Sequence, residues 1–398
     1  MFVMKILNRI ISDKKIIVLI FILTSAFIST HLLLIHGKTF QEEGKRYTYY
    51  NNYQIFKYSY YHLIENKDLY KPYPEEHWDL FKYSPAFSLF FGIFTVLPDF
   101  MGLNLWNLLN ALILLFAVYS LPDIDNRIKG MILLACLTEL VTSMQNSQSN
   151  ALIAGLLILA FGSLERGRNW ASSLCIVLSA SIKLFGILGF LLFLLFPGKW
   201  KSAFWSIFWI VIIALIPLLV IDFNQLKLLY SSWFHLLVND HSSSYGLSRP
   251  GMLNSWFLIP VNKIVILFTG IILLFIPFIR IRNFREYTFR LLILSSLLIW
   301  IVIFNHRAES NSYIIAFAGI SIWYFTTKKI PLNTVLVIFA FIFISLSPTD
   351  IIPRQIRLSF FEPYMLKVLP AVIIWLKITS DLLIFKVNNQ NTGIFAAN

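Results

Sequence analysis

The stretch Ala171–Phe196, ASSLCIVLSASIKLFGILGFLLFLLF, is an apolar run of 26 residues that carries a single charge, Lys183. About 20 apolar residues suffice for a helix that crosses a bilayer. A lysine inside such a run is costly in lipid, and is tolerated where it faces a bundle interior or a water-filled cavity. We therefore predict two half-helices that meet near Lys183 at the tip of a re-entrant hairpin. The alternative is one ordinary helix whose lysine faces the bundle interior.

The rest of the chain repeats this pattern of apolar runs separated by short polar tips. The chain has 398 residues, of which 58% are hydrophobic and 13% charged, whereas a soluble domain carries about 25% charged residues. We predict an all-α polytopic membrane helix bundle of about 11–13 hydrophobic helices, some of them short or re-entrant, in a single domain over residues 1–398. The further runs predicted as helices are 16–36, 84–98, 103–121, 130–144, 149–163, 203–221, 257–279, 287–304, 311–326, 332–346 and 363–385.

The net charge of +13 reflects basic residues in the short tips between apolar runs. Basic tips stay on the cytoplasmic side of a membrane, and no basic groove or helix signature indicates nucleic acid as a partner. The tips 280–285 and 328–329 are therefore predicted to be cytoplasmic, as is the N-terminus. Residues 37–83 form the predicted first outer loop, with interfacial helices, and residues 222–256 form the second.

If the short run 84–98 dips into the membrane without crossing it, the main polar tips all face one side. These tips are 37–83, 145–150, Lys183, 222–256, 305–310 and 347–364. Their convergence predicts a functional site at the outer membrane surface, in contact with membrane lipid.

The first outer loop gathers carboxylates beside an imidazole within five residues, at Glu75, Glu76, His77 and Asp79. Such a cluster suits general-base catalysis, or coordination of a divalent cation such as Mg²⁺ or Mn²⁺. Residues 52–64 carry aromatic side chains at helical spacing, which predicts a helix lying in the interface; a passive aromatic belt is the alternative.

Ser84 and Pro85 are predicted to open the next helix. A serine N-cap followed by proline at the first helical position is a typical helix start.

A run of amides follows the 130–144 helix, at Gln145, Asn146, Gln148 and Asn150. Amides both donate and accept hydrogen bonds, which suits hydroxyl-rich ligands such as sugars. Capping of two helices is the alternative explanation.

Three cations are predicted to share the outer face, namely Lys183, Arg307 and Arg354. Together they would form a clamp for a phosphate, which arginine grips in a bidentate manner. His306 and Glu309 would orient this clamp. The alternative is interhelical ion pairing, for example of Arg307 with Glu309 or Asp350.

The order of several short motifs resembles the GT-C class of integral-membrane glycosyltransferases, in particular the family 87 mannosyltransferases that use polyprenol-phosphate-mannose. The motifs are Asn66-Lys67-Asp68-Leu69-Tyr70, Phe81-Lys82-Tyr83-Ser84-Pro85, Gln148-Ser149-Asn150 and Ala180-Ser181-Ile182-Lys183-Leu184-Phe185. The resemblance implies a lipid-linked sugar donor and catalysis on the outer face, with Tyr83 as a supporting residue.

One position departs from the family pattern. The family usually has an aspartate at the start of the first loop helix, where this chain has Asn52. An amide does not act as a base, so Glu75, Glu76 or Asp79 would have to take that role.

The expectation is a hexosyltransferase, with mannose as the first sugar to test, in the bacterial inner membrane with its active site on the periplasmic face. Its partners would be a polyprenyl-phosphate-linked sugar donor and a saccharide, lipid or protein acceptor. Two other functions stay open: a transporter or flippase for a lipid-linked saccharide, and a non-catalytic membrane subunit of an envelope complex.

Overall fold

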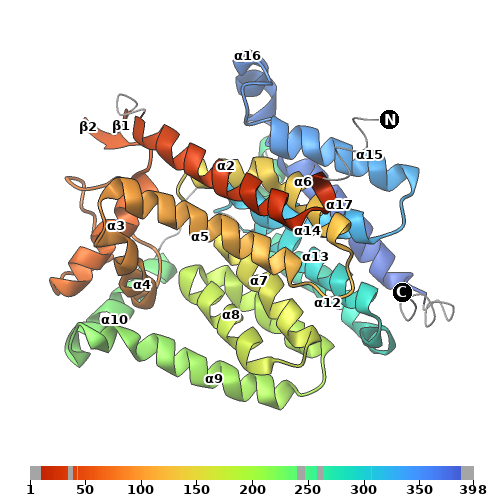
Figure 1. Cartoon of the computed structure of the whole chain (residues 1–398), viewed down its shortest axis with the longest axis horizontal. Coiled ribbons are helices and arrows are strands. Elements are labelled where there is room, and N and C mark those ends of the chain that lie inside the picture. The colour runs from red at the N-terminus through yellow and green to blue at the C-terminus, as the bar shows by residue number, and fades with distance from the viewer. Residues whose placement is uncertain are drawn as a thin grey trace.

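The computed structural model describes residues 10–34, 39–42, 44–239, 247–257, 263–305 and 307–386, which are almost entirely helical (Figure 1). The elements follow one another in this order: α2 (Lys14–Leu34), β1 (Thr39–Glu42), β2 (Lys45–Thr48), α3 (Asn51–Ile64), α4 (Pro85–Thr95), α5 (Asp99–Tyr119), α6 (Asn126–Gln145), α7 (Asn150–Glu165), α8 (Asn169–Ile182), η1 (Leu184–Leu195), α9 (Lys199–Leu215), η2 (Ile216–Leu219), α10 (Phe223–Asn239), α11 (Arg249–Phe257), α12 (Lys263–Phe275), η3 (Ile276–Ile279), η4 (Ile281–Arg285), α13 (Tyr287–Ile303), η5 (Ser310–Ser312), α14 (Tyr313–Thr326), α15 (Pro331–Ala340), η6 (Phe341–Leu346), α16 (Arg354–Ile356), η7 (Arg357–Phe361) and α17 (Val368–Leu383).

Four of these helical segments are long and apolar enough to cross a membrane, within the part of the chain that the structure describes. They are Lys14–Leu34, Asp99–Tyr119, Asn126–Gln145 and Lys199–Leu219, and shorter apolar helices accompany them. The predicted all-α membrane helix bundle is therefore confirmed.

The centre of the bundle is formed by helices that are apolar on nearly every side. Most side chains of α7, α13 and α14 are buried, as expected of helices without a polar face. α7 packs against α5 and α8, whereas α14 packs against α13 and α6. At the periphery, α9 leaves large apolar side chains such as Trp200 and Phe204 exposed, which suits contact with lipid.

The predicted break at Lys183 is confirmed, and the two half-helices fold back on each other. α8 ends at Ile182, and η1 starts at Leu184. A Cβ atom on Gly186 would clash with Ser179, and one on Gly189 would lie 3.1 Å from Ile176 Cγ1. Contacts that run backward along α8 in this way define an antiparallel hairpin, and glycine permits the close approach of its arms.

The first loop is a compact unit that docks on α4. The strands β1 and β2 pair antiparallel, with Phe40 opposite Tyr47, and neither strand was predicted from the sequence. The aromatic helix α3 packs on α4, where a Cβ on Gly92 would clash with the Tyr60 ring. The predicted start of α4 is confirmed, because the Ser84 hydroxyl accepts a hydrogen bond from the Phe87 N–H at 3.3 Å.

The segment predicted as a second outer loop is largely helical, since it contains α10 and α11. α10 lies beside the first loop (Figure 1), to which three of its side chains donate hydrogen bonds. Gln225 Nε2 donates to the Lys67 carbonyl at 3.1 Å. Trp233 Nε1 donates to the Lys82 carbonyl at 3.2 Å, and the Ser232 hydroxyl donates to Asp68 at 3.0 Å. The two predicted outer loops are thus joined.

Candidate active site

Lys183 lies at the tip of the α8–η1 hairpin, with an extended backbone (φ −138°, ψ 129°). Its ammonium group donates to Gln148 Oε1 at 3.2 Å and to Asn150 Oδ1 at 2.9 Å. Both partners are neutral amides, and Lys183 forms no ion pair with any described residue. An ammonium has three N–H donors, so one remains for a ligand and the positive charge is not balanced by a paired carboxylate.

The amide partners of Lys183 are held in place by the end of α6. The Ser147 N–H donates to the Met144 carbonyl, the Gln148 N–H donates to the Ser143 carbonyl, and Ser147 adopts φ +51°. This pattern is a Schellman helix end, which satisfies carbonyls that α6 would otherwise leave unpaired. Trp106 Nε1 donates to the Ser147 carbonyl at 2.9 Å and fixes the turn from α5.

Tyr83 closes the site from the first loop. Its hydroxyl donates to Gln148 Oε1 at 3.1 Å, and its ring lies 5.8 Å from the Lys183 ammonium. Burial raises the pKa of Tyr83, and the Glu309 and Asp79 carboxylates raise it further. The hydroxyl therefore stays protonated and acts as a donor at neutral pH. The negative charges of Glu309 and Asp79 both act on it.

The segment before α14 extends the hydrogen-bonded network. Asn150 Nδ2 donates to Asn311 Oδ1 at 2.7 Å, and Asn311 Nδ2 donates to Glu309 Oε2 at 2.8 Å. Asn150 and Asn311 are buried, whereas Glu309 is exposed. A chain of amides thus links the Lys183 cation to a solvent-facing carboxylate. We call Tyr83, Gln148, Asn150, Lys183 and Asn311 the Lys183 cluster.

A buried ion pair stands next to this cluster. Lys367 Nζ lies 3.2 Å from Glu139 Oε2 and 2.9 Å from the Ser310 hydroxyl, to which it donates. Lys367 and Ser310 also line a cavity of about 480 Å³, which is bordered by Ser347 and Arg357. From its place in an apolar run, Glu139 could be either a buried structural acid or a partner that supports site residues, and its contact with Lys367 was not predicted.

The predicted phosphate clamp is only partly assembled around this region. Arg354 is exposed and is not among the residues that line the cavity beside Lys367, where Arg357 lies instead. Arg307 is half-buried, and its backbone N–H donates to Asn305 Oδ1 at 3.0 Å. His306 lies outside the described residues.

The three first-loop carboxylates are separated by the structure. Glu75 pairs with Lys45, Glu76 lies 2.7 Å from His62 Nε2, and Asp79 lies 2.9 Å from Lys82 Nζ.

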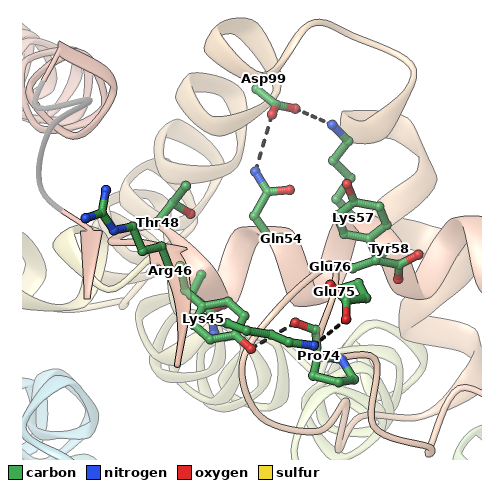
Figure 2. A pocket seen from close by; sticks show the side chains of 12 residues that line it. Lys45, Arg46, Thr48, Gln54, Lys57, Tyr58, Pro74, Glu75, Glu76 and Asp99 are labelled. Atoms are coloured by element: carbon green, nitrogen blue, oxygen red, sulfur yellow. Dashed lines mark hydrogen bonds and ion pairs between the residues drawn. The ribbon is translucent and has the colours of Figure 1, made fainter. Parts of the chain in front are cut away.

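Glu75 and Glu76 line a cavity in the first loop (Figure 2). Asp79 does not line that cavity and acts electrostatically on Tyr83. Among the three carboxylates, Asp79 is therefore the one whose charge contributes to the raised pKa of Tyr83.

His77 is buried in the first loop and is neutral at pH 7. Burial lowers its pKa to about 4, although the hydrogen bond of its Nδ1 with the Asp79 carbonyl, at 3.0 Å, opposes the shift. A neutral histidine in this position supports the backbone around Asp79 and brings no charge.

The two asparagines that open α3 have different partners. Asn51 is hydrogen-bonded to both the N–H and the carbonyl of Trp78, at 2.9 and 2.7 Å. Asn52 Nδ2 donates to the Asn146 carbonyl at 2.9 Å and so ties α3 to the turn before Gln148. Gln145 and Asn146 themselves are exposed, outside the buried part of the cluster.

Within the described residues, no group of three His, Cys, Asp or Glu side chains lies close enough together to hold a metal ion. Asn311 and Lys367 were not predicted as site residues. Each stands alone next to an apolar helix, and only its contact with Asn150 or Glu139, which lie far away along the chain, reveals it.

Comparisons with known proteins give a family and a distant structural likeness. The crystal structure of ArnT from Cupriavidus metallidurans bound to undecaprenyl phosphate matches with a TM-score of 0.37 and 14% sequence identity, over 84% of this chain and 72% of that chain. No curated protein matches the sequence.

The family model of glycosyltransferase family 87 matches residues 81–304. The matched range is more than half of the chain and contains Tyr83, Gln148, Asn150 and Lys183 of the cluster described above. The chain therefore belongs to glycosyltransferase family 87.

Proposed function

We propose that this glycosyltransferase moves a hexose, with mannose as the first candidate, from a polyprenyl phosphate to an acceptor on the periplasmic face of a bacterial inner membrane. The single observation that carries the proposal is the unpaired Lys183 cation, held between two neutral amides at a hairpin tip. A fixed cation without a carboxylate partner is suited to the phosphate of a lipid carrier.

In the proposed reaction, an acceptor hydroxyl oxygen attacks the anomeric carbon of the donor sugar. The bond between that carbon and the phosphate oxygen breaks, and the polyprenyl phosphate leaves with the electron pair. Lys183 stabilises the charge that develops on the leaving phosphate. Gln148 and Asn150 hold Lys183 and offer amide groups to sugar hydroxyls, with Gln145 and Asn146 nearer to solvent.

A carboxylate takes the proton of the acceptor hydroxyl. Among Glu75, Glu76 and Asp79, we assign this role to Asp79, because it is the one that acts on Tyr83. Glu309 reaches the same cluster through Asn311 and orients it. Arg307 and Arg354 remain proposed contacts of the carrier phosphate, with His306 as a residue that orients them. Mg²⁺ or Mn²⁺ remains a proposed cofactor.

The experiment is a transfer assay in membranes that contain this chain. Radiolabelled polyprenyl-phosphate-mannose, -glucose and -arabinose are supplied in parallel, each with and without EDTA, to the wild type and to Lys183→Ala. Lys201→Ala is the matched control, because Lys201 is exposed on α9, away from the hairpin tip.

We expect label to move from the mannose donor to a new product in the wild type and in Lys201→Ala, and to stay on the donor in Lys183→Ala. If label moves only from the glucose or the arabinose donor, that sugar replaces mannose as the proposed donor sugar, and the proposed mechanism is unchanged. No transfer from any donor would favour a non-catalytic subunit. Asn52, which stands where the family has an aspartate and donates to the Asn146 carbonyl, would then have a structural role.

A further inference from the structure

The first loop contains a cavity that the proposed reaction does not use. It has a volume of about 480 Å³ and lies between β2, α3, the turn at residues 74–76 and the start of α5 (Figure 2). This volume falls within the range of small-ligand sites, about 300–1,000 Å³. The cavity is therefore large enough for a sugar unit or a short saccharide.

Among the described residues, the charges around the cavity are balanced. Three of these residues bring a positive charge, namely Lys45, Arg46 and Lys57, and three bring a carboxylate, namely Glu75, Glu76 and Asp99. Lys57 Nζ donates to Asp99 Oδ1 at 2.7 Å, and Lys45 pairs with Glu75, as Figure 2 shows. A balanced set of this kind favours a neutral polar ligand over a strong anion or cation.

The uncharged part of the lining has the chemistry of a saccharide site. Within the described residues it consists of the Tyr47 and Tyr58 rings, the Asn51 and Gln54 amides, Thr48 and Pro74, and the proline is its one aliphatic side chain. Aromatic faces stack on sugar rings, whereas amides and carboxylates exchange hydrogen bonds with hydroxyl groups. A lipid tail would find no apolar wall here.

Several polar groups at the cavity have unused hydrogen-bonding capacity. Arg46 lines the cavity and forms no hydrogen bond or ion pair with the described residues. The Thr48 hydroxyl likewise has no partner there. The paired carboxylates keep free lone pairs as well, because each ionised carboxylate accepts about four hydrogen bonds.

The start of α3 connects the cavity with the turn that carries Gln148 of the Lys183 cluster. Asn51 lines it and binds the backbone of Trp78, which precedes Asp79. The next residue, Asn52, donates to the Asn146 carbonyl beside Gln148. A saccharide held in the cavity could therefore extend past the start of α3 toward the reacting centre.

We propose that this first-loop cavity binds the glycan of the acceptor, so that the acceptor is recognised through its sugar units and not through a lipid tail or a peptide. The inference rests on the proposed transfer reaction and adds the class of acceptor to it. Arg46 and Tyr58 are the specificity-determining residues, since both line the cavity and neither belongs to the proposed catalytic set.

The test measures saccharide binding to the full chain in nanodiscs by saturation-transfer NMR. The probes are mannobiose, maltose and lactose, and a separate arm places diglucosyldiacylglycerol in the nanodisc to distinguish a glycolipid head group from a free glycan. The variants are Arg46→Ala and Tyr58→Ala. Lys71→Ala is the control, because Lys71 is exposed on the same loop and does not line the cavity.

We expect saturation transfer to at least one probe, with affinity about tenfold weaker in Arg46→Ala, which loses a hydrogen bond from a charged group, and unchanged in Lys71→Ala. No saturation transfer to any probe, or equal affinity in wild type and both cavity variants, would overturn the proposal. Saturation transfer in a preparation that fails to transfer sugar would support the cavity and contradict the proposed donor reaction.

Discussion

The Lys183 cluster and the first-loop cavity are both polar, but they differ in whether their charged groups are paired with groups of opposite charge. The cluster surrounds one cation with neutral amides and leaves it without an ion pair among the described residues. Among the described residues, as many carboxylates as cations line the cavity, and most of these groups are paired. The first arrangement is suited to an anionic phosphate, and the second is suited to a neutral, hydroxyl-rich molecule.

The two regions also differ in what the family assignment covers. Tyr83, Gln148, Asn150 and Lys183 all fall within the matched residues 81–304, whereas the first-loop cavity is built almost wholly from residues before that range. Family membership therefore bears on the donor side of the site. The acceptor side has to be argued from the structure of this chain.

The largest expected effect concerns the buried ion pair next to the Lys183 cluster. Glu139→Gln leaves Lys367 as a buried cation without a carboxylate, which costs about 3–5 kcal/mol of folding free energy. The exposed Lys45–Glu75 pair provides the control, and Glu75→Gln is expected to change stability little. Thermal unfolding in one detergent measures both variants, and equal stabilities would contradict the distinction between buried and exposed pairs.

The next effect is a pH dependence of the first loop, caused by His77. Its pKa is lowered by burial from 6.5 to about 4, so the unfolded chain takes up a proton before the folded chain does. Stability is full above pH 6.5 and falls by up to about 3 kcal/mol as the pH drops toward 4. His77→Gln should flatten melting temperatures measured between pH 7 and pH 5; an unchanged slope would show that other groups cause it.

Asp79→Asn is expected to reduce transfer about a hundredfold, because it removes the proposed base. Lys82→Ala breaks the same ion pair and keeps the carboxylate, so it separates catalysis from local structure. Glu75→Gln and Glu76→Gln should leave the transfer rate within a few-fold of the wild type. If Glu75→Gln or Glu76→Gln lost transfer activity while Asp79→Asn stayed active, the base would be a carboxylate of the first-loop cavity and not Asp79.

Asn150→Asp should raise the KM for the lipid donor about tenfold with a smaller change in kcat, because a carboxylate there would pair with the Lys183 cation. Asn169→Asp, at the opposite end of α8, is the control. A KM that stays constant in Asn150→Asp would argue against an unbalanced cation as the donor site.

Much of the fold could be predicted because it depends on the free-energy cost of placing particular residues in particular local surroundings. Lys183 within an apolar run required a break, and Ser84 with Pro85 required a helix start; both are confirmed. α10 was missed because its apolar residues alternate with polar ones in a way that also occurs in a long loop. The strands β1 and β2 were missed because four-residue strands carry little periodic signal.

The candidate site was predictable only where its residues form motifs. Gln148, Asn150 and Lys183 were chosen for their residue types, and the structure brings them into contact. Asn311, Lys367 and Arg357 were missed, since each depends on a contact between distant segments. The sequence pattern also did not show that Arg357, and not Arg354, would line the cavity beside Lys367.

The most direct test of the central claim is the affinity of the purified chain for undecaprenyl phosphate, measured for the wild type, Lys183→Ala and Lys201→Ala in the same detergent. The unbalanced Lys183 cation predicts binding by the wild type and by Lys201→Ala, with affinity at least about tenfold weaker in Lys183→Ala. Equal affinity in all three proteins would contradict the assignment of Lys183 to the carrier phosphate.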